Sequence, residues 1–318
     1  MKRSKSPEEI FTLYDDLYKR PDYNFIKKKT GEIWKNYEEN LNITKPQNYD
    51  TILRQYNEEY YNLFKRLLEN YPHKSSFYLG FYNIENFNAE SSIIDGHNFV
   101  LIDNNLKSFY LEVILALYHL TYKDELSTIE KEDINSYINY SFQRFHFQSQ
   151  LEKNSFIHYD YLFDDLASRS HEYFFHSVIC MYATLYFILG HELGHFYYGH
   201  SSIKTTITRS TEVNVTDQEL EADLYAYRQF LLVTRDIRPN NNTNVSHHFD
   251  HIPLLMFDIL ERYYSEFTSS SNFHSHPPPR ERKEHLLNNI KSSLTSEGQK
   301  MMTDLKETLD KVIIHPVG

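Results

Sequence analysis

The feature that most constrains this sequence is an apolar stretch that runs directly into a cluster of titratable residues. Residues 174–190 contain few polar side chains, and the segment HELGH, from His191 to His195, follows without a break. The stretch is shorter than the ~20 residues that a membrane span needs. We therefore expect a buried core helix from about Ser170 to Tyr198, whose last turns carry the titratable cluster.

Two histidines in this cluster are spaced to share one metal ion. His191 and His195 are four residues apart, so on a helix they project from one face, one turn apart. Glu192 then stands beside the metal without ligating it, and can take a proton from a metal-bound water. This is the HExxH arrangement of zinc metalloproteases. The alternative, a helix with two surface histidines, is disfavoured by the apolar stretch before the motif.

A catalytic zinc ion needs a third protein ligand and an open fourth position. Glu219 and Asp223 are four residues apart on a helix that we expect to begin at Thr216, so their carboxylates share a face. Glu219 is the candidate ligand, and Asp223 the candidate acceptor for the free ring N–H of a ligand histidine. Thr216 and Glu219 also fit a capping box, which is the alternative for Glu219. Glu221 faces elsewhere, and we expect it in solvent.

Other histidines are weaker candidates. His200 follows His195 by five residues, which places it about a third of a turn out of register. His247, His248 and His251 lie beside an Asn-rich loop, and we expect them at the surface, with a second metal site as the minor alternative.

The rest of the chain has the pattern of an α+β protein that is mostly α-helical, with a small sheet preceding the helix of the HExxH motif. The expected elements are helices within residues 6–75, strands at 76–84 and 97–102, helices at 106–122 and 131–147, and an amphipathic helix in about the last 30 residues. We expect two parts: residues 1–75, an accessory helical region, and residues 76–318, the domain that carries the motif.

Composition excludes several classes of partner. The formal charge is -11, from 44 acidic and 33 basic residues, so the chain lacks the charge that nucleic-acid binding needs. The basic start is followed by polar residues, which is not the pattern of a signal peptide. Cys180, the one cysteine, cannot form an internal disulfide and fits a reducing compartment. We expect a cytoplasmic protein without a membrane partner.

The motif residues resemble the gluzincin peptidases, in which HExxH is followed by a glutamate ligand on a second helix. The likeness is strongest to the Lit phage-exclusion peptidases of bacteria, and more distant to CAAX-type zinc endopeptidases. Three blocks carry it, at residues 188–195, 218–223 and 274–282. The resemblance implies a zincin-like (gluzincin) core and one Zn²⁺ ion bound by His191, His195 and Glu219.

The third block adds two candidates by resemblance. His276 and Arg282 are expected to contact the oxyanion or a substrate carboxylate. The alternative is a proline-rich loop whose arginine pairs with surface acids. The resemblance also implies an edge strand that pairs with an extended peptide, for which residues 97–102 are the candidate. An ordinary core strand is the alternative there.

The sequence therefore predicts a soluble zinc-dependent endopeptidase that hydrolyses a protein or peptide substrate. The resemblance implies phage defence by abortive infection, with an activating trigger protein or peptide that residues 1–75 could sense. One alternative is a regulatory peptidase of the ImmA/IrrE type that cleaves a repressor; it is disfavoured by the His-Pro block and by the lack of a recognisable helix-turn-helix. The other is a non-catalytic zinc-stabilised interaction protein, in which Glu192 would be dispensable.

Overall fold

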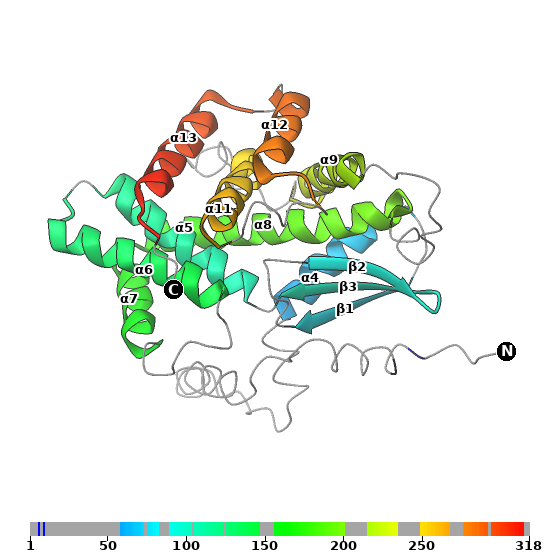
Figure 1. Ribbon diagram of the computed structural model, residues 1–318, viewed down its shortest axis with the longest axis horizontal. Helices are drawn as coiled ribbons and strands as arrows, with labels where there is room; N and C mark the ends of the chain where they lie inside the picture. Colours follow the sequence, from blue (N-terminus) through cyan, green and yellow to red (C-terminus); the bar gives the residue numbers. More distant parts are fainter. Residues whose placement is uncertain are drawn as a thin grey trace.

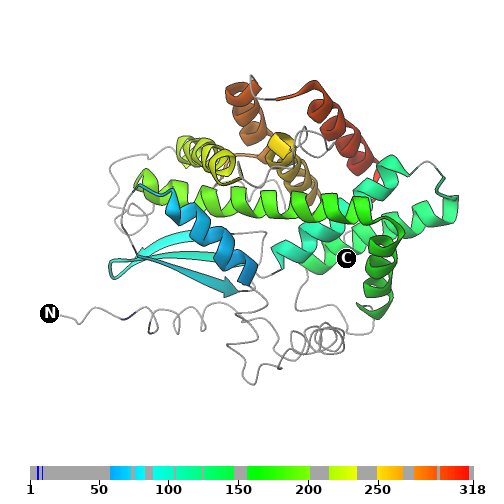
Figure 2. The same ribbon diagram turned by 180° about the vertical axis from the view of Figure 1, so that it is seen from behind.

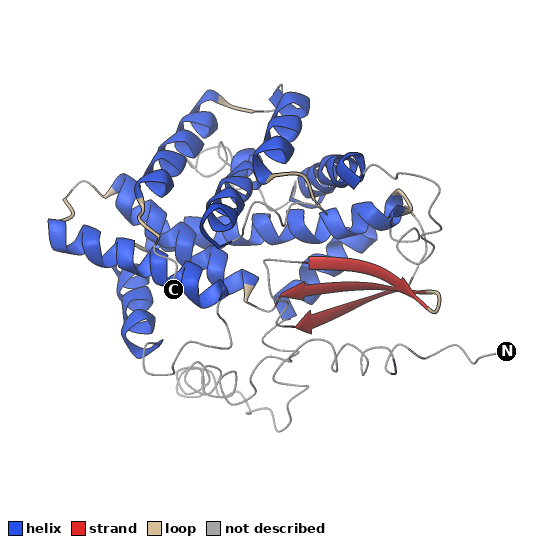
Figure 3. Ribbon diagram, in the orientation of Figure 1, coloured by secondary structure: helices blue, strands red, loops and turns tan. Residues whose placement is uncertain are grey.

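The computed structural model describes residues 6, 9, 58–72, 76–82, 89–103, 105–123, 125–146, 156–200, 215–234, 249–267, 276–291 and 294–314. These residues form a mostly helical α+β structure with one small sheet, as the sequence predicts (Figures 1 and 3). The helices are α4 (Glu58–Glu69), α5 (Leu106–Tyr122), α6 (Thr128–His146), α7 (Phe156–Arg169), α8 (His171–Tyr197), α9 (Val215–Thr234), α11 (Ile252–Phe267), α12 (Pro279–Ile290) and α13 (Ser296–Lys311), with a short 3-10 turn, η3 (Phe249–His251).

The apolar stretch forms the central helix of the molecule. Ser170 caps α8, because its hydroxyl accepts a hydrogen bond from the backbone N–H of Tyr173. In Figure 1, α8 runs horizontally through the middle of the molecule, with the sheet below it and α9, α11 and α12 above it. Its length and composition would allow it to cross a membrane, but 56% of its most apolar window is buried inside the protein. This burial agrees with the predicted core helix and is compatible with a soluble protein.

The sheet contains three strands in the order β1-β3-β2, where β1 is Phe77–Tyr82, β2 is Ala89–Ile94 and β3 is His97–Asp103. β3 pairs in parallel with β1 and antiparallel with β2. Asp95 and Gly96 form the β2–β3 turn with positive φ angles, as the Asp-Gly signal predicts. Within the described residues β3 is the central strand, so the edge-strand interpretation of residues 97–102 is wrong and the alternative, an ordinary core strand, is confirmed. β2, whose serine-rich sequence gave no strand signal, covers the other side of β3.

Capping residues explain where several helices begin. Ser127 and Glu130 form a reciprocal capping box, so α6 begins at Thr128, three residues before the expected start. Ser6 and Glu9 form a second such box at the start of the chain. α5 has the bounds that the sequence predicts, whereas α7 was not predicted.

α4 lies within the expected accessory region and packs against α8. Tyr60, Leu63 and Leu67 are buried in the same core as α8, and Phe64 contacts Phe77 of β1 edge to face. Figure 2 shows α4 in front of the sheet and below α8. The last helix of the accessory region thus shares the hydrophobic core of the rest of the chain.

α8 and α9 form the most extensive helix–helix contact among the described elements. Gly190 and Gly194 of α8 face Ala226 and Ala222 of α9. A Cβ atom added at Gly194 would lie 3.0 Å from the Cα of Ala222, and one at Gly190 would lie 3.2 Å from the Cα of Ala226. The two backbones can approach this closely only because α8 carries glycine at both positions.

We predict that Gly194→Ala lowers the free energy of unfolding by about 1–3 kcal/mol, since overpacking forces α9 away from α8. The loss would outweigh the gain of up to ~1 kcal/mol that alanine gives in a helix interior. Urea unfolding followed by circular dichroism measures the change. Gly190→Ala is the matched control with a smaller expected loss, because its contact is longer. A Gly194→Ala variant as stable as the wild type would show that α9 tolerates a wider spacing.

Candidate metal centre

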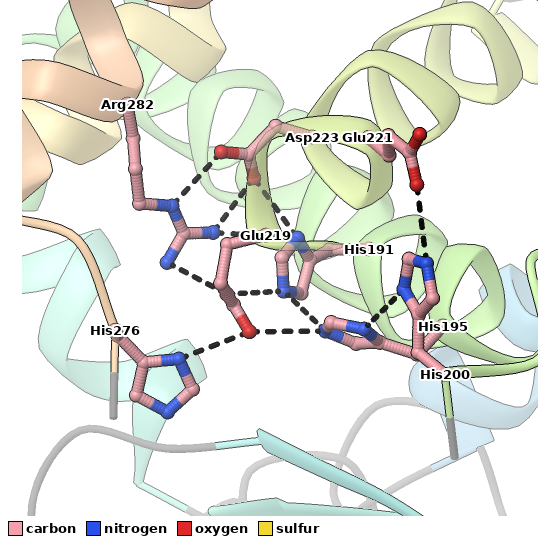
Figure 4. A network of polar contacts seen from close by, with 8 residues as sticks. All are labelled: His191, His195, His200, Glu219, Glu221, Asp223, His276 and Arg282. Carbon is pink, nitrogen blue, oxygen red and sulfur yellow. Dashed lines mark hydrogen bonds and ion pairs between the residues drawn. The ribbon is translucent and has the colours of Figure 1, made fainter. Parts of the chain in front are cut away.

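Three of the predicted site residues meet between α8 and α9. The Nε2 atoms of His191 and His195 lie 3.0 Å apart, and the carboxylate of Glu219 faces both (Figure 4). Glu219 Oε2 lies 3.2 Å from His191 Nε2, and Oε1 lies 3.4 Å from His195 Nε2. One ligand atom from each residue thus lies within 4.8 Å of the other two, in a group that could hold a metal ion.

The spacing and chemistry of this group fit a zinc ion. Zinc binds imidazole nitrogen and carboxylate oxygen at about 2.0–2.2 Å, so tetrahedral ligand atoms lie roughly 3.3 Å from one another. The observed separations of 3.0–3.4 Å are close to that value, with a different oxygen of Glu219 facing each histidine. Glu219 Oε2 is also buried and makes no hydrogen bond of acceptable geometry within the described part of the chain. A bound cation would add a direct partner to this buried oxygen, which otherwise has only the ion pairs with His191 and Arg282.

Asp223 contacts the Nδ1 side of the His191 ring, and Arg282 contacts Asp223. Asp223 Oδ1 accepts a hydrogen bond from His191 Nδ1 at 2.9 Å, which leaves Nε2 facing Glu219, where it could bind a metal ion in place of a proton. Arg282 of α12 donates from Nε and Nη2 to the two oxygens of Asp223, at 2.8 and 2.7 Å. Its Nη1 lies 3.4 Å from Glu219 Oε2. One arginine therefore contacts both the candidate ligand and the residue that orients His191.

The charges of this cluster favour a cation between its carboxylates. Burial disfavours every charged form, but Arg282 and His191 outweigh it and lower the pKa of Asp223. His191 and His276 likewise lower the pKa of Glu219 against its burial. Burial and Arg282 oppose the charged form of His191, yet Asp223 and Glu219 raise its pKa to about 10. In the absence of a metal, a proton on His191 thus supplies the positive charge that a metal ion would otherwise supply.

Two further candidates, Glu192 and His276, lie on different elements beside this group. Glu192 is 5% exposed and follows His191 directly on α8. His276 lies just before α12, on the opposite side of Glu219 from α8, and its Nδ1 is 3.0 Å from Glu219 Oε1 (Figure 4). The His276 side chain is 46% exposed, whereas the side chain of Glu219 beside it is 4% exposed.

Some of the sequence-based expectations need correction. His251 was expected at the surface but is 1% exposed, because η3 leads directly into the apolar helix α11 and turns it inward. Glu221 is exposed to solvent, as expected, and its carboxylate Oε2 also lies 3.2 Å from Nε2 of His200. His247 and His248 lie outside the described residues.

His200 is the site residue whose placement sequence reasoning missed. Its ring nitrogen Nδ1 lies 3.2 Å from Nδ1 of His195. Burial lowers the pKa of His200, which favours the neutral imidazole, although Glu221 opposes this shift. The sequence signal for this contact was that His200 follows His195 by only five residues. The two rings come together because the chain turns back after the end of α8.

Comparison with known proteins gives one match. The family model of peptidase U49 matches residues 118–302, which is more than half of the chain and includes α8, α9 and α12. No curated protein matches, and no solved structure matches.

We predict that the purified chain binds one zinc ion, and that His191→Ala, His195→Ala and Glu219→Ala each remove most of the bound metal. Each change deletes one of three ligand side chains. Inductively coupled plasma mass spectrometry after gel filtration measures the ratio of zinc to protein. His276→Ala is the control that should retain zinc. Equal zinc content in all four variants would show that the metal binds elsewhere.

Arg282→Ala should lower the free energy of unfolding by about 3–5 kcal/mol, because it leaves the buried carboxylate of Asp223 without its cation. Arg282→Lys should lie between this variant and the wild type, since lysine keeps the charge but lacks the planar fork. Unfolding in the presence of a chelator isolates this effect from zinc binding. Identical unfolding curves for the wild type and Arg282→Ala would contradict the structural role.

Proposed function

Because the chain belongs to the peptidase U49 family, we propose that it is a zinc-dependent endopeptidase with a zincin-like (gluzincin) core, acting on a protein substrate. One observation supports the zinc chemistry most directly: His191, His195 and Glu219 present two imidazole nitrogens and a buried carboxylate to one point. Three protein ligands with one open side are the arrangement of catalytic zinc sites, whereas structural sites are closed by a fourth protein ligand.

In this proposal Glu192 moves the proton. When bound, zinc would act as a Lewis acid and make water acidic enough to lose a proton near neutral pH. Glu192, on the same helical turn as His191, would accept that proton and return it to the leaving amine. The position of Glu192 supports this role, since it follows His191 directly on α8 and is 5% exposed.

His276 and Arg282 are assigned different roles by their contacts. Nδ1 of the half-exposed His276 contacts Glu219 Oε1, so its other ring nitrogen, when protonated, would be the donor that stabilises negative charge on the substrate carbonyl. Arg282 donates two hydrogen bonds to Asp223. This contact supports a role in positioning His191 and not a role in direct contact with the substrate.

The biological role that we propose is phage defence by abortive infection, in the cytoplasm of a bacterium. It rests on the resemblance of the three motif blocks to the Lit phage-exclusion peptidases. Such an enzyme would be damaging to the cell if it were always active, so we propose that a trigger protein or peptide activates it. Residues 1–75 are the proposed place for that regulation.

Glu192→Gln should retain zinc and lose cleavage by at least ~100-fold, because glutamine cannot accept the proton. Mass spectrometry of new protein N-termini, in cells that express either form and are infected with phage, measures cleavage whichever cellular protein is the substrate. His191→Ala provides the zinc-free control.

Two outcomes would contradict this proposal. The same new N-termini in the wild type and Glu192→Gln would place the cleavage in another enzyme. Equal protection against phage by both forms would favour a zinc-stabilised interaction protein without catalysis.

A further inference from the structure

We propose that His200 and Glu221 form a second positioning pair, which orients the ligand His195 as Asp223 orients His191. This inference rests on the proposed zinc site and assigns a role to two residues outside its ligand set. The contacts form one continuous chain, from His195 Nδ1 to His200 Nδ1 at 3.2 Å and from His200 Nε2 to Glu221 Oε2 at 3.2 Å (Figure 4).

The end of α8 brings His200 into this position. Tyr198 is the C-cap residue of α8, and Gly199 follows with φ of 77°, the left-handed conformation in which glycine ends helices. The chain therefore folds back, and His200 returns toward the side of α8 that carries His195. The His200 ring stacks on the Tyr198 ring at 5.6 Å between centroids, with 19° between the planes. His200 is 8% exposed, so packing restricts its orientation.

The direction of the hydrogen bonds follows from which atoms are already committed. Nε2 of His195 faces His191 and Glu219, so its lone pair is needed there and its Nδ1 carries the proton. His200 Nδ1 must then accept, which requires the proton of His200 on Nε2. Glu221 accepts that Nε2–H. The carboxylate thus selects the tautomer of His200, and His200 selects the tautomer of His195.

The two ligand histidines are held with different strength. Asp223 is fully buried and bound by the fork of Arg282, whereas the Glu221 side chain is 54% exposed. Water can replace an exposed carboxylate more easily than a buried one. We therefore expect the loss of the His200 acceptor to matter more than the loss of Glu221.

The test compares three changes at His200. Phenylalanine retains a ring that can stack on Tyr198 but offers no acceptor, whereas asparagine offers an amide oxygen near the position of Nδ1. We expect His200→Phe to bind zinc about 10–100-fold more weakly, His200→Ala similarly, and His200→Asn within a few-fold of the wild type. Competition with a chromogenic chelator measures the zinc dissociation constants. Glu221→Ala should weaken zinc binding by less than His200→Phe does.

A second readout separates orientation from general stability. The visible spectrum of the cobalt-substituted protein reports the geometry of the ligands, and it should change in His200→Phe but not in His200→Asn. Thermal unfolding of the metal-free variants checks that His200→Phe folds as the wild type does. If His200→Phe does not fold, the comparison of His200→Asn with His200→Ala carries the same test.

Failure of this inference is distinguishable from failure of the proposed function. Wild-type zinc affinity and an unchanged cobalt spectrum in His200→Phe would overturn the positioning role and leave the zinc site intact. A wild-type protein that binds no zinc would overturn the proposed function itself. Wild-type zinc binding in His200→Phe together with weakened binding in His200→Asn would show that ring packing on Tyr198, and not the hydrogen bond, is what His200 supplies.

Discussion

The close approach of α8 and α9 is the constraint on which the site depends. Gly190 and Gly194 let the α9 backbone come within van der Waals contact of α8, opposite Ala226 and Ala222. Gly194 lies inside the HELGH segment, directly before its second histidine. The residue that permits the close contact with α9 is therefore part of the motif itself. At a wider spacing, the carboxylates of α9 could not reach the imidazoles of α8. Packing at glycine thus determines the geometry of the candidate ligands.

Charge balance gives this arrangement its preference for a cation. Glu219 and Asp223 are both buried, while Arg282 supplies one positive charge between them. The three side chains together carry a net charge of about -1 when ionised, which burial makes costly. A divalent cation, bound with neutral histidines, would more than offset this negative charge and bring the sum to about +1. The same carboxylates that raise the pKa of His191 would therefore favour a zinc ion in place of the proton on that residue.

The sequence predicted those parts of the site that one helix determines. The four-residue spacings of His191 with His195 and of Glu219 with Asp223 follow from helical geometry, and α8 begins where its cap residue Ser170 predicts. Contacts between elements were harder to predict from the sequence, because they depend on the path of the segments that connect the elements. The central position of β3, the burial of His251 and the pairing of His200 with Glu221 all belong to this class.

The placement of Arg282 shows how a distant segment completes the site. Its neighbour Lys283 donates to both oxygens of Asp258 on α11 at 2.6 Å, and Asp258 is buried. Phe257, beside Asp258, lies under the guanidinium of Arg282, 5.3 Å from ring centroid to Cζ. Two adjacent residues of α11 thus hold two adjacent residues of α12. This pairing fixes the position of α12, and α12 in turn brings the fork of Arg282 to Asp223. Through Arg282, α11 and α12 therefore contribute to the candidate metal centre.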